Sequence, residues 1–233
     1  MDLIYLLLSD WWPVAVGVIA ALIFSIITSV NVDATFAKFN GMYVGSKTPA
    51  CDAARQILDM NGLYDVQIIK VPGRLTDHYD PKKKIIALSE AVYGSATVGA
   101  IGVAAHECGH AIQYAKDYTP VKLRNIFFPV VNICSRSWAL IFLLGCMFSW
   151  GILIEVGIIF FAVIVLYQLL TLPVEFDASR RAIDVLISTG ILYGQEVAGA
   201  RKVLKAAAMT YISALINAIM QLLRLIANTN RRR

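Results

Sequence analysis

Three residues in the middle of the chain have the types and the spacing of a metal-dependent hydrolytic site. His106, Glu107 and His110 form the pattern His-Glu-x-x-His, and only one further histidine occurs in the chain. On a helix, residues four apart share one face, so the imidazoles of His106 and His110 can bind one metal ion. Two imidazole nitrogens supply half of a tetrahedral zinc site. Glu107 would stand beside the metal, where a general base takes a proton from the attacking water.

The composition of the chain is that of a membrane protein. Of its 233 residues, 58% are hydrophobic and 16% are charged, whereas an ordinary soluble domain is about half apolar. The net charge is only +5, and the basic residues lie beside apolar runs. We therefore expect a lipid bilayer as partner and no nucleic acid. The four cysteines are scattered without a Cys-x-x-Cys pair, so we expect neither a disulfide framework nor a thiolate zinc site.

Three apolar runs are long enough to cross a bilayer, namely Trp12–Ser29, Ile126–Phe148 and Ile152–Leu172. We read the first as a retained anchor, because no Lys or Arg precedes it as in a signal peptide. The other two are separated by residues 149–151 and form a predicted transmembrane hairpin. Those three residues include no Lys or Arg, whereas basic residues flank the hairpin. The positive-inside rule then places the metal site on the cytoplasmic side.

A catalytic zinc site needs a third protein ligand and leaves one position for water. Glu175 lies at the cytoplasmic end of the second hairpin helix, on the side predicted for the motif. Glu155 is the alternative, but it precedes Glu175 by about 20 residues, or about 30 Å along a helix. The alternative role of Glu175 is a salt bridge with Arg180 or Arg181. We favour Glu175 as the third ligand.

The segments before the motif predict a short helix and two strands. The helix lies between Pro49 and Gly62, and the strands are 66–71 and 84–88. Residues 72–81 between the strands are rich in turn formers, so we expect a two-stranded hairpin just before a metal helix at 95–114. The edge of this hairpin can hold an extended peptide by main-chain hydrogen bonds, or the hairpin is only structural. Both interpretations stay open at this point.

The last segment, Ala206–Asn228, is helical and moderately apolar. Its polar residues recur every three or four positions and form one stripe: Thr210, Ser213, Asn217, Gln221, Arg224 and Asn228. If this segment crossed the membrane, residues 231–233, which are all arginine, would lie outside, against the charge rule. It either lies in the membrane interface or packs its stripe into the bundle.

Three stretches together resemble a known family. They are Leu75–Pro81 (LTDHYDP), Ala104–Gln113 (AAHECGHAIQ) and Leu172–Ala182 (LPVEFDASRRA). They are similar to the YugP-type neutral zinc metallopeptidases, and this resemblance covers nearly the whole chain. The order of motif, transmembrane hairpin and glutamate also resembles the gluzincin membrane peptidases HtpX and the CAAX prenyl proteases.

The resemblance implies a zinc-dependent peptidase of the bacterial inner or plasma membrane with one zinc ion. By matching, His106 and His110 carry over as ligands, Glu107 as the catalytic acid/base and Glu175 as the third ligand. The implied fold is mainly α: a multi-pass membrane helical bundle with a small α+β gluzincin-like domain that carries a β-hairpin next to the metal helix. The expected organisation is an N-terminal anchor (1–40), a cytoplasmic catalytic region (41–125), a transmembrane hairpin (126–173) and a C-terminal part (174–233), integrated as one domain.

One position departs from the pattern of many gluzincins. Four residues after the glutamate ligand they carry an aspartate that orients a histidine, and here that position is Ser179. The nearest acidic residue is Asp177. Ser179, Asp177, Asp77 or a backbone carbonyl is therefore the predicted partner of the imidazoles.

The oxyanion of the reaction also needs a partner beyond the metal. His78 and Tyr79 are the candidates, because they lie in the segment between the predicted strands, although a turn histidine satisfied by its own loop is an equal alternative for His78.

The function expected from these residues is hydrolysis of peptide bonds in membrane-associated or unfolded proteins. The alternative from another class is a non-proteolytic zinc-binding membrane scaffold or adaptor. Glu107 argues against the scaffold, since a closed structural site needs no general base. A metal transporter would need ionisable residues in the middle of its spans, and Ile126–Phe148 offers only Arg136, toward its start. Substrate, membrane-protein partners and homo-oligomeric state are left open.

Overall fold

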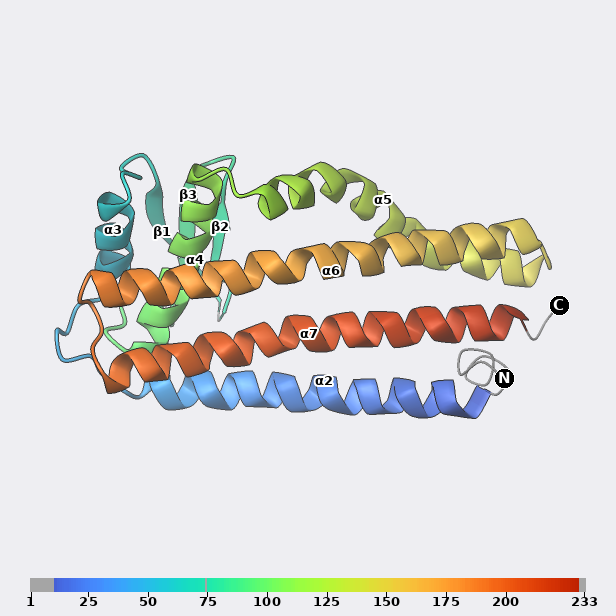
Figure 1. Ribbon diagram of the computed structural model, residues 1–233, viewed down its shortest axis with the longest axis horizontal. Coiled ribbons are helices and arrows are strands. Elements are labelled where there is room, and N and C mark those ends of the chain that lie inside the picture. Colours follow the sequence, from blue (N-terminus) through green and yellow to red (C-terminus); the bar gives the residue numbers. More distant parts are fainter. Residues whose placement is uncertain (1–10, 74, 231–233) are drawn as a thin grey trace. The chain divides into compact units, whose positions relative to one another are not determined.

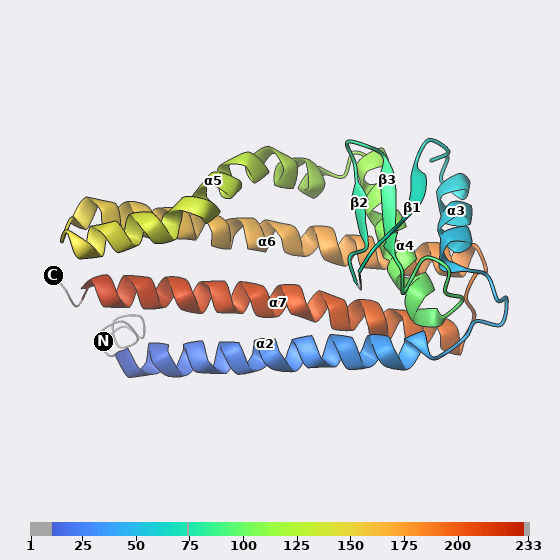
Figure 2. The same cartoon turned by 180° about the vertical axis from the view of Figure 1, so that it is seen from behind.

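The computed structural model describes residues 11–73 and 75–230 (Figures 1 and 2). The first ten residues of the predicted anchor lie outside this part. The elements in chain order are α2 (Trp11–Asn40), α3 (Ala50–Met60), β1 (Gln67–Val71), β2 (His78–Asp80), β3 (Ile85–Ser89), α4 (Val98–Ala115), α5 (Thr119–Met147), α6 (Gly151–Ser188) and α7 (Gln195–Asn230). The prediction of a mainly α fold with a small β component is confirmed.

The chain divides into two compact units. The helical unit comprises residues 1–28, 122–172 and 210–233, and the site unit comprises residues 29–121 and 173–209. The helices α2, α5, α6 and α7 each contribute residues to both units. The histidine-glutamate motif, Glu175 and the sheet all belong to the site unit.

Four helices of the described chain are long and apolar enough to cross a membrane: α2, α5, α6 and α7. Large apolar side chains on them are exposed, among them Ile26, Ile133 and Leu166. Such exposure is costly in water and favourable in lipid. These four include α7, whose segment Ala206–Asn228 the sequence placed either in the membrane interface or with its stripe packed into the bundle.

Part of the polar stripe of α7 packs against α2 within the helical unit. Ser213 is buried, and its hydroxyl accepts a hydrogen bond from the Thr28 hydroxyl of α2 at 3.0 Å. Small hydroxylated residues of this kind join membrane helices. Arg224 and Asn228, further along the stripe, are exposed.

The sheet corrects the predicted hairpin. The first and third strands, β1 and β3, are paired in parallel, and β2 pairs antiparallel with β3 on its other side. The hairpin next to the metal helix is therefore β2–β3, and the segment predicted as a long turn contains a strand. The tight turn is nucleated by Asp80, whose carboxylate accepts hydrogen bonds from the backbone N–H groups of Lys82 (2.9 Å) and Lys83 (3.2 Å). A three-residue strand is too short to show an alternating pattern in the sequence.

The metal helix α4 lies in the hydrophobic core of the site unit. Its first turn is capped by Thr97, whose side chain accepts a hydrogen bond from the Ala100 N–H. Ile101, Ala104 and Ala105 are fully buried. The helix packs against α3 and contacts β2 and β3. This packing holds the motif on a rigid element, as an enzymatic or metal site requires.

Candidate metal centre

Two helices bring three potential ligands together. His106 and His110 come from α4, and Glu175 comes from α6. The Glu175 Oε2 lies 3.4 Å from the Nε2 of His106 and 3.5 Å from the Nε2 of His110. All three ligand atoms lie within 4.8 Å of one another. The structure thus assembles the residues that the sequence proposed as ligands.

The geometry of these donors fits a zinc ion. Bonds of about 2.0–2.1 Å in a tetrahedron place neighbouring ligand atoms about 3.3 Å apart. The two nitrogen–oxygen distances match that separation within a few tenths of an ångström. The Glu175 side chain is 5% exposed, whereas those of His106 and His110 are 16% and 13% exposed. The imidazoles therefore retain access to solvent, which a fourth, water-occupied position requires.

A close approach of α4 and α6 places the carboxylate within reach of the imidazoles. A Cβ atom on Gly109 would lie 2.4 Å from the backbone carbonyl oxygen of Ala178. Gly109 directly precedes His110, and Ala178 follows Glu175 by three residues, on the same helical face. Only glycine allows the two backbones to meet at this point of α4.

The second ring nitrogens of both histidines have partners. The Nδ1 of His106 lies 3.2 Å from the Ser179 hydroxyl, and the Nδ1 of His110 lies 3.1 Å from the Oε1 of Gln113. Ser179 follows Glu175 by four residues, so both side chains lie on one face of α6. The serine at the position of the expected aspartate therefore still reaches an imidazole.

Gln113 fixes the tautomer of His110. Its Nε2 donates hydrogen bonds to the Val174 carbonyl (2.8 Å) and to the Asp177 carboxylate (2.9 Å). Because these acceptors take the amide N–H groups, the amide oxygen faces His110 and must accept a proton from its Nδ1. The Nε2 of His110 then carries the free lone pair that a metal needs.

Asp177 connects this contact to two cations. Its carboxylate accepts hydrogen bonds from Arg180 and from the Nε of Arg181 at 2.5 Å. Asp177 is buried, and the two guanidinium groups compensate its charge. Asp177 thus acts on His110 through Gln113 rather than directly.

Gln113 is the site residue that the sequence analysis missed. It lies within the Ala104–Gln113 stretch, but we assigned it no role. The available signal was its spacing, since a residue three positions after His110 shares its helical face.

Glu107 is buried next to the imidazoles, at 7% exposure. Burial lowers the pKa of His110, but the hydrogen bond to Glu175 and the charge of Glu107 outweigh it, so the pKa of His110 lies above its usual value. The negative charges of Glu107 and Glu175 therefore stabilise a positive charge next to the imidazoles.

Cys108 lies inside the motif but packs away from it. Its thiol contacts the Ala54 carbonyl of α3, and burial raises the pKa of Cys108 far above the usual range. The thiolate that zinc binds is thus disfavoured at this position.

Three further sequence-predicted residues lie at or beside β2, and their described contacts are with residues other than the three proposed ligands. Asp77 accepts hydrogen bonds from the backbone N–H (2.7 Å) and the hydroxyl of Ser89, and so joins the start of β2 to the end of β3. The exposed His78 has its Nδ1 2.9 Å from the Thr76 carbonyl oxygen. Tyr79 is half-buried, and its ring packs edge-on against Tyr114 of α4, with centroids 5.5 Å apart.

The described chain is mainly helical, with four helices long and apolar enough to cross a membrane, and it brings together two histidines and one glutamate that could hold a metal ion. The sequence profile of the family described as "Putative neutral zinc metallopeptidase" matches residues 14–230, and the chain belongs to this family. A relative from Bacillus subtilis (strain 168), described as "Putative membrane protease YugP", is 44% identical over 208 residues, or 89% of this chain and 92% of the relative. No solved structure matches the chain. The resemblance stated from the three sequence motifs is thereby confirmed.

The glycine contact gives a direct test of how the centre is assembled. In Gly109→Ala the added methyl group meets the Ala178 carbonyl oxygen and forces α4 and α6 apart. We expect a loss of stability of about 1–3 kcal/mol together with a reduced zinc content. Thermal denaturation and metal analysis of the purified protein measure both.

Gly94→Ala is the matched control, because no atom lies within 4 Å of a Cβ added there. It should keep both the stability and the zinc content of the unchanged protein. Full zinc binding by Gly109→Ala would show that the close approach does not control the centre.

Proposed function

We propose that the protein is a membrane-embedded zinc endopeptidase that hydrolyses peptide bonds of membrane-associated or unfolded proteins. One observation carries the proposal: the convergence of His106, His110 and Glu175 beside an intact Glu107, with both imidazoles at a tetrahedral nitrogen–oxygen separation from the carboxylate. Membership of a zinc metallopeptidase family supports zinc as the metal and proteins as the substrates.

In this proposal each residue of the centre has a defined task. His106, His110 and Glu175 hold one zinc ion, which polarises the scissile carbonyl and lowers the pKa of water when bound. Glu107 accepts the proton of the attacking water and passes it to the leaving amide nitrogen. Ser179 and Gln113 keep the two imidazoles oriented, and Gln113 holds the proton of His110 on Nδ1.

Tyr79 is the better candidate for stabilising the oxyanion. The phenol of Tyr79 is a hydrogen-bond donor at neutral pH, and burial, followed by the neighbouring Tyr114, raises its pKa further. Its strand contacts α4, and its ring packs against that helix. The Nδ1 of His78, by contrast, is already engaged by its own loop.

The sheet offers a place for the substrate backbone. The strand order β1-β3-β2 makes β2 an edge strand, and β2 contacts the metal helix. An edge strand has unpaired main-chain groups that can bind an extended peptide. The sequence left open whether the predicted hairpin binds a peptide or is only structural, and we assign the peptide-binding role to the β2 edge.

The proposed location is the cell membrane, with the centre facing the cytoplasm. Four helices long and apolar enough to cross a membrane support the location, as does the membrane protease description of the relative. The orientation rests on the charges alone: residues 148–150, which connect α5 and α6, include no Lys or Arg.

Glu107→Gln tests the assigned general base. The substitution removes the proton acceptor and leaves the three proposed ligands in place, so zinc should stay bound while cleavage is lost. We expect hydrolysis of an unfolded protein such as casein to fall by at least about 100-fold. Cleavage by the detergent-solubilised protein, with and without chelator, and its zinc content are the measurements.

The scaffold alternative gives a different result. A protein whose zinc is only structural would bind zinc and cleave nothing before the substitution, so inactive but zinc-loaded starting protein would contradict the peptidase. Full cleavage by Glu107→Gln would contradict the role of Glu107 and leave the peptidase itself standing.

Gln113→Ala tests the orientation of His110. Without the amide, the proton of the imidazole is free to move to Nε2, and the metal affinity should fall by about 10–100-fold. Competition with a chromophoric chelator measures this affinity. Gln56→Ala, on the exposed face of α3, is the matched control and should not change it. An unchanged zinc affinity in Gln113→Ala would remove Gln113 from the centre.

A further inference from the structure

A cavity of about 340 Å³ lies between the polar ends of α2 and α7 in the site unit. In both views these ends run side by side (Figures 1 and 2). The cavity is lined by Asn31, Thr35, Lys38 and Phe39 of α2 and by Lys202, Lys205, Ala206 and Met209 of α7. We propose that it binds the phosphate headgroup of an anionic phospholipid.

The charge of the cavity supports an anion as the occupant. Its lining contains three lysines and no acidic residue. All three lysines are exposed, and Lys202 and Lys205 are three residues apart on one helix, where like charges repel. Among residues 11–73 and 75–230, no ion pair neutralises these two side chains. A phosphate group would relieve the repulsion and accept several ammonium hydrogen bonds.

The position of the lysines along their helices supports a lipid as the source of the phosphate. Lys205 directly precedes Ala206, where the apolar run of α7 begins. Lys38 follows Val30, the end of the apolar run of α2, by about 12 Å of helix. Basic residues at such junctions lie at the level of the lipid headgroups and attract anionic lipids.

Three of the five lining residues other than the lysines are apolar, namely Phe39, Ala206 and Met209. Phe39 is buried, and Ala206 and Met209 belong to the apolar part of α7. A free phosphate ion has no use for these surfaces, whereas a phospholipid carries glycerol and methylene groups next to its phosphate. The lining therefore fits a lipid better than an inorganic anion.

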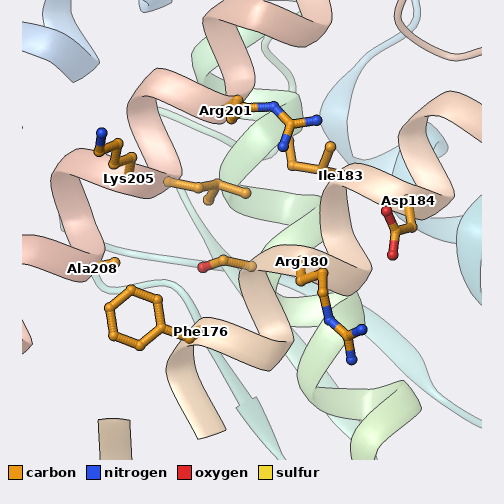
Figure 3. A pocket seen from close by; sticks show the side chains of 9 residues that line it. Phe176, Arg180, Ile183, Asp184, Arg201, Lys205 and Ala208 are labelled. Carbon is orange, nitrogen blue, oxygen red and sulfur yellow. The ribbon is translucent and has the colours of Figure 1, made fainter. Parts of the chain in front are cut away.

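A neighbouring cavity of about 370 Å³ between α6 and α7 fits an anion less well (Figure 3). Arg201 and Lys205 border it from α7, and Arg180 and Asp184 border it from α6. Asp184 offsets part of the positive charge, and Arg180 is already paired with Asp177. These differences assign the headgroup to the α2–α7 cavity.

The lysines also help to set the orientation of the helices in the membrane, but that role does not explain why they line one cavity. The positive-inside rule depends only on the number of basic residues near the ends of a span. It does not require Lys38 and Lys202, which are far apart in the sequence, to line one cavity. Convergence of this kind is characteristic of a binding site.

Calorimetric titration of the detergent-solubilised full chain tests the proposal. The probes are dioctanoyl-phosphatidylglycerol, which is anionic, dioctanoyl-phosphatidylcholine, which is zwitterionic, and inorganic phosphate. We expect saturable binding of the anionic lipid at one site per chain and much weaker binding of the other two. The double variant Lys202→Gln/Lys205→Gln should bind the anionic lipid about 25-fold more weakly, at about fivefold for each lost charge.

Lys82→Gln/Lys83→Gln is the control of equal charge, since both lysines are exposed in the turn between β2 and β3. It should bind like the unchanged protein, and thermal denaturation should show that both variants are folded. Any one of three results would overturn the proposal. They are equal binding of the two lipids, equal weakening by both double variants, and binding of inorganic phosphate as tight as that of the anionic lipid. Zinc content, measured on the same preparations, reports separately on the metal centre.

Discussion

The candidate metal centre depends on one steric constraint, the contact of α4 and α6 at Gly109 and Ala178. Each helix carries only part of the donor set, and neither can form the centre alone. The missing side chain of glycine lets the backbones meet, and the helical repeat then places Glu175 opposite the two imidazoles. A carboxylate fixed in this way binds a cation without reorganisation, which is the property a catalytic centre needs.

Near this contact, four polar side chains are joined by a chain of hydrogen bonds. It runs from His110 through Gln113 and Asp177 to Arg181, with every step a hydrogen bond. Buried polar groups are costly unless they are paired, so this chain of hydrogen bonds stabilises the packing of α4 and α6 as well as orienting a ligand. The structural and the proposed catalytic roles of these residues are therefore coupled.

The sequence predicted the features that depend on local patterns. The motif, the apolar runs and the metal helix could be predicted because spacing and hydropathy repeat along a single helix. The two predicted strands do pair with each other, but the predicted hairpin geometry was wrong: β1 and β3 are parallel, and β2 adds to the other side of β3. No local pattern encodes the direction of such a pairing. The role of Gln113 also escaped prediction, since its amide finds Val174 and Asp177 only after two distant helices meet.

The most direct measurement is X-ray absorption spectroscopy at the zinc edge of the purified protein and of Glu175→Ala. Our account predicts one zinc per chain with four nitrogen and oxygen neighbours at about 2.0–2.1 Å, two of them imidazoles. In Glu175→Ala one oxygen neighbour should be lost or replaced and the zinc content should fall. A sulfur neighbour, or an unchanged spectrum and full occupancy in the variant, would contradict a centre built by His106, His110 and Glu175.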